Sequence, residues 1–160
     1  MTTNGHDIKV LNGLIETTID SADGYREAAS ETDNARYRAL FEQRSFERKE
    51  VATDLQSTVR TLGGDPEDDG SILAKAHRAF LDIKHALLRD EQAVVNSVEN
   101  GEDFIKAKFE TALEDSDVSA TTREAIRRAY ASVRSGHDQM RDLKHSLEGQ
   151  KDADGSVFPN

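Results

Sequence analysis

The chain has 160 residues, a formal net charge of −10 and no cysteine. This length fits a single domain that can bury a hydrophobic core. The lack of cysteine excludes disulfides, thiolate metal sites and a cysteine nucleophile. The acidic balance argues against nucleic acid or an anionic membrane as a partner, because both bind basic surfaces.

Residue usage predicts an all-α protein. Ala, Glu, Asp, Leu and Arg dominate, there are only 2 prolines, and no alternating run of valine and isoleucine appears. No apolar run approaches the roughly 18 residues that a membrane-spanning helix needs. Residues 1–7 are polar and lack an apolar signal core, so we expect them to form a flexible leader of a cytoplasmic protein.

The first half of the chain predicts a helical hairpin. Apolar residues recur at three- and four-residue steps over about 8–30 and again over about 34–62. Asp33 suits the N-cap of the second helix, so the connection is short and the two helices should be antiparallel. The sequence GGDP at 63–66 contains both usual stop residues and should end this helix.

The second half predicts three further helices, at about 72–89, 91–114 and 121–147, and a disordered tail over 149–160. The last two of these helices would form a second hairpin. Residues 63–89 join the two hairpins and are long enough to run the full height of a bundle. The second helix and the 91–114 helix could then be parallel, which is the one-crossover topology of ferritin-like bundles, with an extra helix in the crossover.

Two arginines interrupt the apolar stripe of the second helix. The residues of that stripe are Tyr37, Leu40, Phe41, Val51, Ala52, Leu55, Val59 and Leu62. Arg44 and Arg48 fall on its centre. An unpaired charge in an apolar seam costs several kcal/mol, so this helix must meet a carboxylate of another helix or have a wet centre.

Several stretches resemble known ferritin-like proteins. Residues 25–29 (YREAA), the pair Leu40-Phe41 and Leu55 are similar to the first hairpin of rubrerythrins. A bacterial family of ferritin-like four-helix-bundle proteins of unknown function is more similar. The matching stretches are 11–16 (LNGLIE), 62–66 (LGGDP), 101–103 (GED) and His137. The resemblance covers roughly 8–147 and implies the fold, but little about activity.

The resemblance also allows a check of the metal site of the superfamily. There, two helices each carry an inward Glu, and the other two each carry Glu-x-x-His. The residues at the corresponding positions here are Thr18 on the first helix, Arg48 and Val51 on the second, Glu102 on the 91–114 helix, and Arg134 and His137 on the last. The resemblance therefore implies that Glu102 and His137 alone are retained.

We expect these positions to form a polar core in place of the metal site. Arg48, with Arg44 as a second candidate, would pair with Glu102, because a guanidinium matches a carboxylate well. His137 would hydrogen-bond to the pair, with Tyr130 as a further candidate. The expected core comprises Arg44, Arg48, Glu102, His137, Thr18 and Tyr130. An anion pocket or a small-ligand pocket at the arginines is the functional alternative.

A different metal site is possible in another register. Glu47-x-x-Glu50 and Glu99-x-x-Glu102 look like paired carboxylates, and with His137 they could hold iron or manganese. At 100° per residue, however, Glu50 points away from its apolar stripe and Glu99 lies off its own stripe. Solvated helix faces are the default interpretation of these residues. We interpret the remaining histidines as surface residues or, at His6, as part of the leader.

These observations predict a non-enzymatic ferritin-like bundle without a cofactor. It would associate with itself, as a dimer, or with a protein partner, in a role related to stress. Leu81 and Leu88 lie off the main stripe of the 72–89 helix and could face a second subunit. The alternative function is a di-iron or di-manganese carboxylate oxidoreductase or an iron-binding protein.

Overall fold

A computed structural model of the chain describes residues 3–68 and 91–157. This part of the chain contains four helices and no strand, so the predicted all-α four-helix bundle is confirmed. The helices are α1 (Thr3–Glu31), α2 (Ala35–Thr61), α4 (Glu91–Glu114) and α5 (Ala120–Val157). None of them is long and apolar enough to cross a membrane. The helix expected over 72–89 lies outside the described residues.

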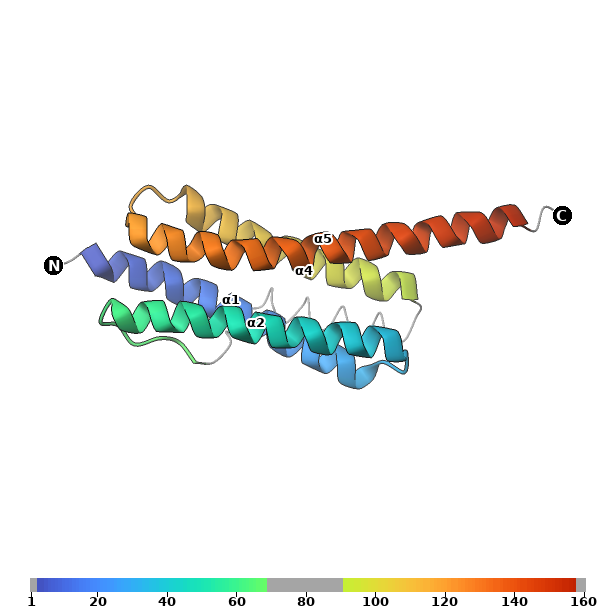
Figure 1. The fold of residues 1–160 in the computed structure, drawn as a ribbon, viewed down its shortest axis with the longest axis horizontal. Helices are drawn as coiled ribbons and strands as arrows, with labels where there is room; N and C mark the ends of the chain where they lie inside the picture. Colours follow the sequence, from blue (N-terminus) through green and yellow to red (C-terminus); the bar gives the residue numbers. More distant parts are fainter. Residues whose placement is uncertain (1–2, 69–90, 158–160) are drawn as a thin grey trace.

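The four helices pair as two antiparallel hairpins. Helix α1 lies along α2, and α4 lies along α5 (Figure 1). The hairpins meet through contacts of α2 with α5 and of α1 with α4. Helices α2 and α4 run in the same direction (Figure 1), as the one-crossover topology predicts.

Helix α1 begins at Thr3, whereas residues 1–7 were expected to be a flexible leader. The side chain of Asp7 is 1% exposed. Its carboxylate accepts hydrogen bonds from the backbone N–H of Ser119 at 3.2 Å and from the hydroxyl of Thr122 at 2.9 Å. Ser119 and Thr122 are separated from Asp7 by 112 and 115 residues in the sequence. The polar composition of residues 1–7 therefore could not predict these contacts.

Helix α5 continues to Val157, beyond its expected end near Leu147 and into the expected tail. The expected tail contains Gly149 and Gly155, but a glycine inside a helix costs only about 1 kcal/mol relative to alanine. Proline disrupts a helix far more strongly than glycine does, and Pro159 comes after both glycines in the sequence. The two glycines were therefore too weak a signal to predict the end of the helix.

Helix α2 has well-defined caps. Asn34, rather than the expected Asp33, is its N-cap, and its side-chain oxygen accepts from the N–H groups of Arg36 at 3.0 Å and Tyr37 at 3.1 Å. Both residue types suit this position. At the other end Gly63 adopts a φ of 85°, which glycine accommodates without strain, and ends the helix where the sequence GGDP predicts.

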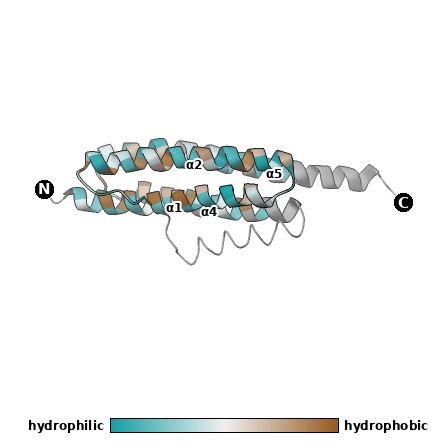
Figure 2. Cartoon of the chain, turned by 90° about the horizontal axis from the view of Figure 1, so that it is seen from below, coloured by the Kyte–Doolittle hydropathy of each residue, from teal (hydrophilic) through white to brown (hydrophobic). Residues whose placement is uncertain are grey.

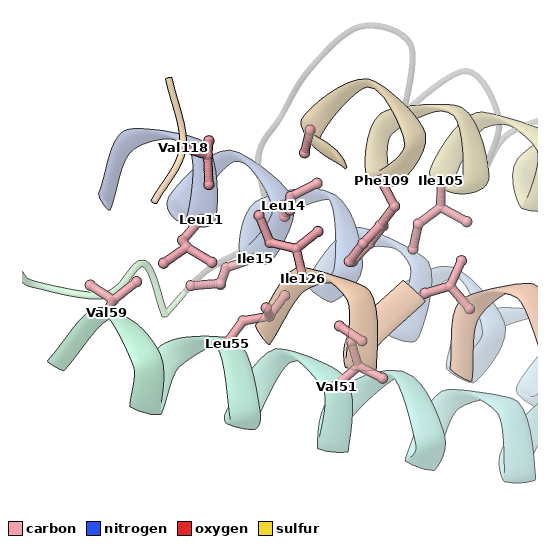
Figure 3. Packing of buried hydrophobic residues seen from close by; sticks show 13 residues of the cluster. Leu11, Leu14, Ile15, Val51, Leu55, Val59, Ile105, Phe109, Val118 and Ile126 are labelled. Carbon is pink, nitrogen blue, oxygen red and sulfur yellow. The ribbon is translucent and has the colours of Figure 1, made fainter. Parts of the chain in front are cut away.

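Hydrophobic residues recur along each helix among hydrophilic ones (Figure 2) and form two buried clusters. The larger cluster includes Leu11, Ile15, Leu55, Phe109 and Ile126 from all four helices (Figure 3). The members of the smaller cluster are Tyr25, Ala28, Ala29, Tyr37, Phe41, Val98 and Met140. The buried charges described next, Arg44 and Arg48 on α2 and Glu102 on α4, lie between the members of the two clusters on these helices.

Candidate functional site

The most unusual feature of the interior is a set of polar residues, buried except for the half-buried Ser21, where the two apolar clusters meet. We call Ser21, Tyr25, Arg44, Arg48 and Glu102 the central polar layer. Both arginines and the glutamate rank among the largest fully buried side chains of the protein. Burying a charge is costly unless it is paired, so the partners of these groups determine what the layer can do.

Arg48 and Glu102 form an ion pair in the centre of the bundle. Nη2 of Arg48 lies 2.6 Å from Oε2 of Glu102, and their side chains are 0% and 1% exposed. Nη1 of Arg48 donates to the hydroxyl of Ser21 at 2.9 Å. The low local dielectric strengthens such a pair, and removing one partner would leave the other charge buried and uncompensated. The pair joins α2 to α4, and the serine adds α1.

Tyr25 completes the environment of Glu102. Its hydroxyl donates to Oε1 of Glu102, and its ring lies 5.9 Å from Cζ of Arg48, within range of a cation–π contact. Burial, reinforced by the nearby carboxylate, raises the pKa of Tyr25 well above its ordinary value. The phenol therefore stays protonated near neutral pH and acts as a hydrogen-bond donor to Glu102.

Sequence reasoning did not include Tyr25 in the expected polar core. A usable signal was present, because a buried tyrosine hydroxyl usually has a hydrogen-bond partner. Glu102 was the carboxylate predicted to lie inward on the neighbouring half of the bundle. Combining these two requirements would have pointed to their contact.

Arg44 lies next to this group and is 2% exposed. Its guanidinium donates through Nη1 to Glu47, one turn away on α2, and through Nη2 to Gln139 on α5. The charge of Arg44 is therefore paired at the edge of the bundle, whereas that of Arg48 is paired at its centre. The layer contains two cationic groups, and each has a carboxylate partner.

Gly136 allows α5 to close over both arginines. A Cβ atom at this position would lie 2.6 Å from Nη2 of Arg48 and 2.8 Å from Nη1 of Arg44. The two guanidiniums therefore converge on one point of the α5 backbone. Sequence reasoning missed this residue. Gly13, Gly24 and Gly101 also lie inside helices, and a Cβ at each meets nothing within 4 Å, so a helical glycine alone gave no signal.

His137 contacts Asp103 and not the expected Glu102. Its Nε2 lies 2.5 Å from Oδ1 of Asp103, and its Nδ1 lies 3.5 Å from Oδ1 of Asp138. Asp103 follows Glu102 on α4, and one residue turns the direction of a side chain by about 100°. The histidine therefore joins α5 to α4 at the surface side of their interface, beside the layer.

Thr18 and Tyr130 are also separate from the layer. The hydroxyl of Thr18 donates to the backbone carbonyl of Leu14 at 2.7 Å, which satisfies it within its own helix. The hydroxyl of Tyr130 donates to Glu110 at 2.8 Å. Burial, with this hydrogen bond, raises the pKa of Tyr130. Tyr130 packs against the larger apolar cluster and not against the arginines.

The alternative metal ligands do not converge among the side chains that the structure describes. Glu47 pairs with Arg44, and with the exposed Glu50 it lines a surface groove between α2 and α5. Glu102 is taken by Arg48 and Tyr25, and His137 by Asp103. The convergent His and Asp side chains that the described part does contain lie elsewhere, at His6, Asp115 and Asp117.

The residues at the centre do not fit a di-metal site. A site of that kind needs several converging carboxylates and imidazoles. Here a single buried carboxylate is occupied by a guanidinium and a phenol, and a second guanidinium lies alongside. The positive charge of both arginines opposes the binding of a cation at this point.

Comparison with known proteins places the chain in a family. The model of a domain of unknown function (DUF2383) matches residues 6–115, which is more than half of the chain. The chain belongs to the DUF2383 family. No match is found among curated proteins. The DUF2383 match spans α1, α2 and α4, and so includes Tyr25, Arg48 and Glu102, whereas Gly136 and Gln139 of α5 lie beyond it.

Proposed function

We propose that this DUF2383 chain is a non-enzymatic, ferritin-like bundle protein that acts through association with a second copy or with a protein partner. In this proposal an arginine–glutamate ion pair takes the place of a di-metal centre. The observation that carries it is the buried contact of Arg48 with Glu102 at 2.6 Å.

Electrostatics supports this interpretation of the centre. Two unit charges about 4 Å apart interact by about 4 kcal/mol at the effective dielectric of a protein, and a divalent ion doubles this. A metal ion at Glu102 would meet that repulsion from Arg48 and would have to displace its hydrogen bonds. The carboxylate would also lose the phenol of Tyr25 as a donor.

The helix order supports the ferritin-like part of the proposal. Helices α2 and α4 are parallel, and each belongs to an antiparallel hairpin (Figure 1). Ferritin-like bundles share this arrangement, with one long crossover between the hairpins. The DUF2383 match itself specifies neither an ancestry nor a role.

Phe46 on α2 is a large hydrophobic side chain that is 64% exposed, and it offers one contact for a partner. Leu81 and Leu88, which suggested a dimer, lie outside the described residues. The dimer, the stress-related role and the cytoplasmic location stay predictions. Light scattering coupled to size exclusion would give the mass in solution, and a strict monomer would contradict self-association.

Metal content tests the proposed centre. The full chain would be expressed with added iron and manganese, purified without chelators or an affinity tag, and measured by elemental analysis. We expect at most one iron or manganese per chain, and none that is lost in Glu102→Gln. About two per chain, abolished by Glu102→Gln but retained in His6→Ala, would overturn the proposal and favour the oxidoreductase alternative.

A further inference from the structure

A second group of polar side chains lies at one end of the bundle, away from the central polar layer. The start of α1 meets the turn between α4 and α5 there (Figure 1). One ligand atom each of His6, Asp115 and Asp117 lies within 4.8 Å of the others. Nε2 of His6 is already 2.8 Å from Oδ2 of Asp115. An imidazole and two carboxylates from distant parts of the sequence therefore converge.

The backbone that carries these three residues is held in place by its neighbours. Asp7, next to His6, is buried and bonds to the N–H of Ser119 and the hydroxyl of Thr122, which fixes the start of α1 against α5. The guanidinium of Arg123 donates to the backbone carbonyl of Asp115 at 2.7 Å. Ligands on backbone that is already fixed lose little entropy when an ion binds.

The charges at this end suit a cation. Oδ1 of Asp115 accepts a hydrogen bond from the backbone N–H of Asp117 at 2.9 Å, which orients this carboxylate, and Asp117 adds a second acidic side chain. The His6 side chain is 43% exposed and that of Asp115 is 27% exposed. An ion could therefore enter from solvent and keep water molecules on its remaining positions.

We propose that His6, Asp115 and Asp117 form a surface site for one divalent transition-metal ion of the zinc class. One imidazole with two carboxylates is a ligand set for zinc, cobalt or manganese, whereas Ca²⁺ and Mg²⁺ favour oxygen ligands alone. The bound ion would bridge α1 to the turn between α4 and α5. This site shares no residue with the central polar layer and does not rest on the proposed function.

Calorimetric titration of the untagged full chain with zinc tests the site. We expect one ion per chain. His6→Ala and Asp117→Asn should each weaken the affinity by more than about tenfold, since loss of an outer partner alone costs 10–100-fold. His145→Ala is the matched control, because it removes an exposed histidine of α5 far from this end, and it should leave the affinity unchanged.

Two further measurements make the result decisive. Thermal unfolding should show that zinc raises the melting temperature of the wild type and of His145→Ala, but not of His6→Ala, whose helical circular dichroism without metal should match the wild type. Cobalt should give visible absorption bands that need His6. Undetectable zinc binding, or equal binding by the wild type and both ligand variants, would overturn the proposal. So would calcium binding as tight as zinc binding and insensitive to His6→Ala.

Discussion

Single residues determine whether the helices of this bundle can approach the buried charges. Gly136 is the clearest case, because α5 contacts both guanidiniums at its missing side chain. The arginines cannot simply move aside. Arg48 is held by Glu102 and Ser21, and Arg44 by Glu47 and Gln139. A larger residue would have to break some of these contacts or displace α5.

We predict that Gly136→Ala lowers the free energy of unfolding by about 1–3 kcal/mol, as overpacking of an interior does. This loss would occur although alanine favours a helix more than glycine does. Gly24→Ala in α1 is the control, because a Cβ there meets nothing within 4 Å. It should stabilise the protein by up to about 1 kcal/mol. Equal gains for both variants in urea unfolding would contradict the packing account.

Asp7 makes the stability of the bundle depend on pH. Burial alone would raise the pKa of Asp7, but the hydrogen bonds from Ser119 and Thr122 outweigh it and hold that pKa below its ordinary value. A carboxylate with a lowered pKa in the folded state contributes stability above its unfolded pKa of about 3.9. That contribution is lost as the pH falls through the folded pKa.

We therefore predict that Asp7→Asn is about 1 kcal/mol less stable than the wild type at pH 7, because a charged acceptor is replaced by a neutral one. The difference should shrink as the pH is lowered below 4. Urea unfolding of both proteins between pH 3 and pH 7 measures it. A difference that stays constant with pH would show that the charge of Asp7 contributes nothing.

Residue patterns predicted some members of the central polar layer and missed others. The spacing of the α2 stripe placed Arg44 and Arg48 inside, and the requirement for a counter-charge pointed to Glu102. Tyr25 was missed because its polar end is invisible to a pattern that scores apolar residues. His137 was expected to bond to Glu102 and instead contacts Asp103, the next residue on α4, whose side chain points about 100° away from that of Glu102.

At the scale of helices, ends were harder to predict than helices themselves. The bounds of α4 agree with its apolar period, and α2 begins close to where its cap was expected. The start of α1 depends on contacts of Asp7 with α5, and the end of α5 on weak glycine penalties. Local sequence contains the period of a helix but not the distant contacts that extend it.

The N-cap of α2 offers a direct test at this scale. Asn34→Ala should cost about 1 kcal/mol, because the first N–H groups of the helix lose their acceptor. Asp33→Ala, one position earlier and exposed, should change stability by less than about 0.5 kcal/mol. Chemical denaturation of the two variants compares them. A larger cost for Asp33→Ala would assign the cap to Asp33 instead.

At the scale of the whole molecule, the order of helix lengths was enough to predict the topology. A short loop forces neighbouring helices to be antiparallel, whereas the long stretch between α2 and α4 lets them be parallel, as they are (Figure 1). The centre of the bundle then brings together α1, α2 and α4 at Tyr25, Arg48 and Glu102. The ion pair is therefore expected to affect the stability of the entire bundle.

A double-mutant cycle at Arg48 and Glu102 tests this account most directly. Arg48→Met leaves a buried carboxylate unpaired and Glu102→Gln leaves a buried guanidinium unpaired, so each should cost about 3–5 kcal/mol. The double variant leaves no unpaired charge, and the amide can still accept from Tyr25. We predict that it costs far less than the sum of the two single changes. Small and additive effects in urea unfolding would contradict the buried ion pair.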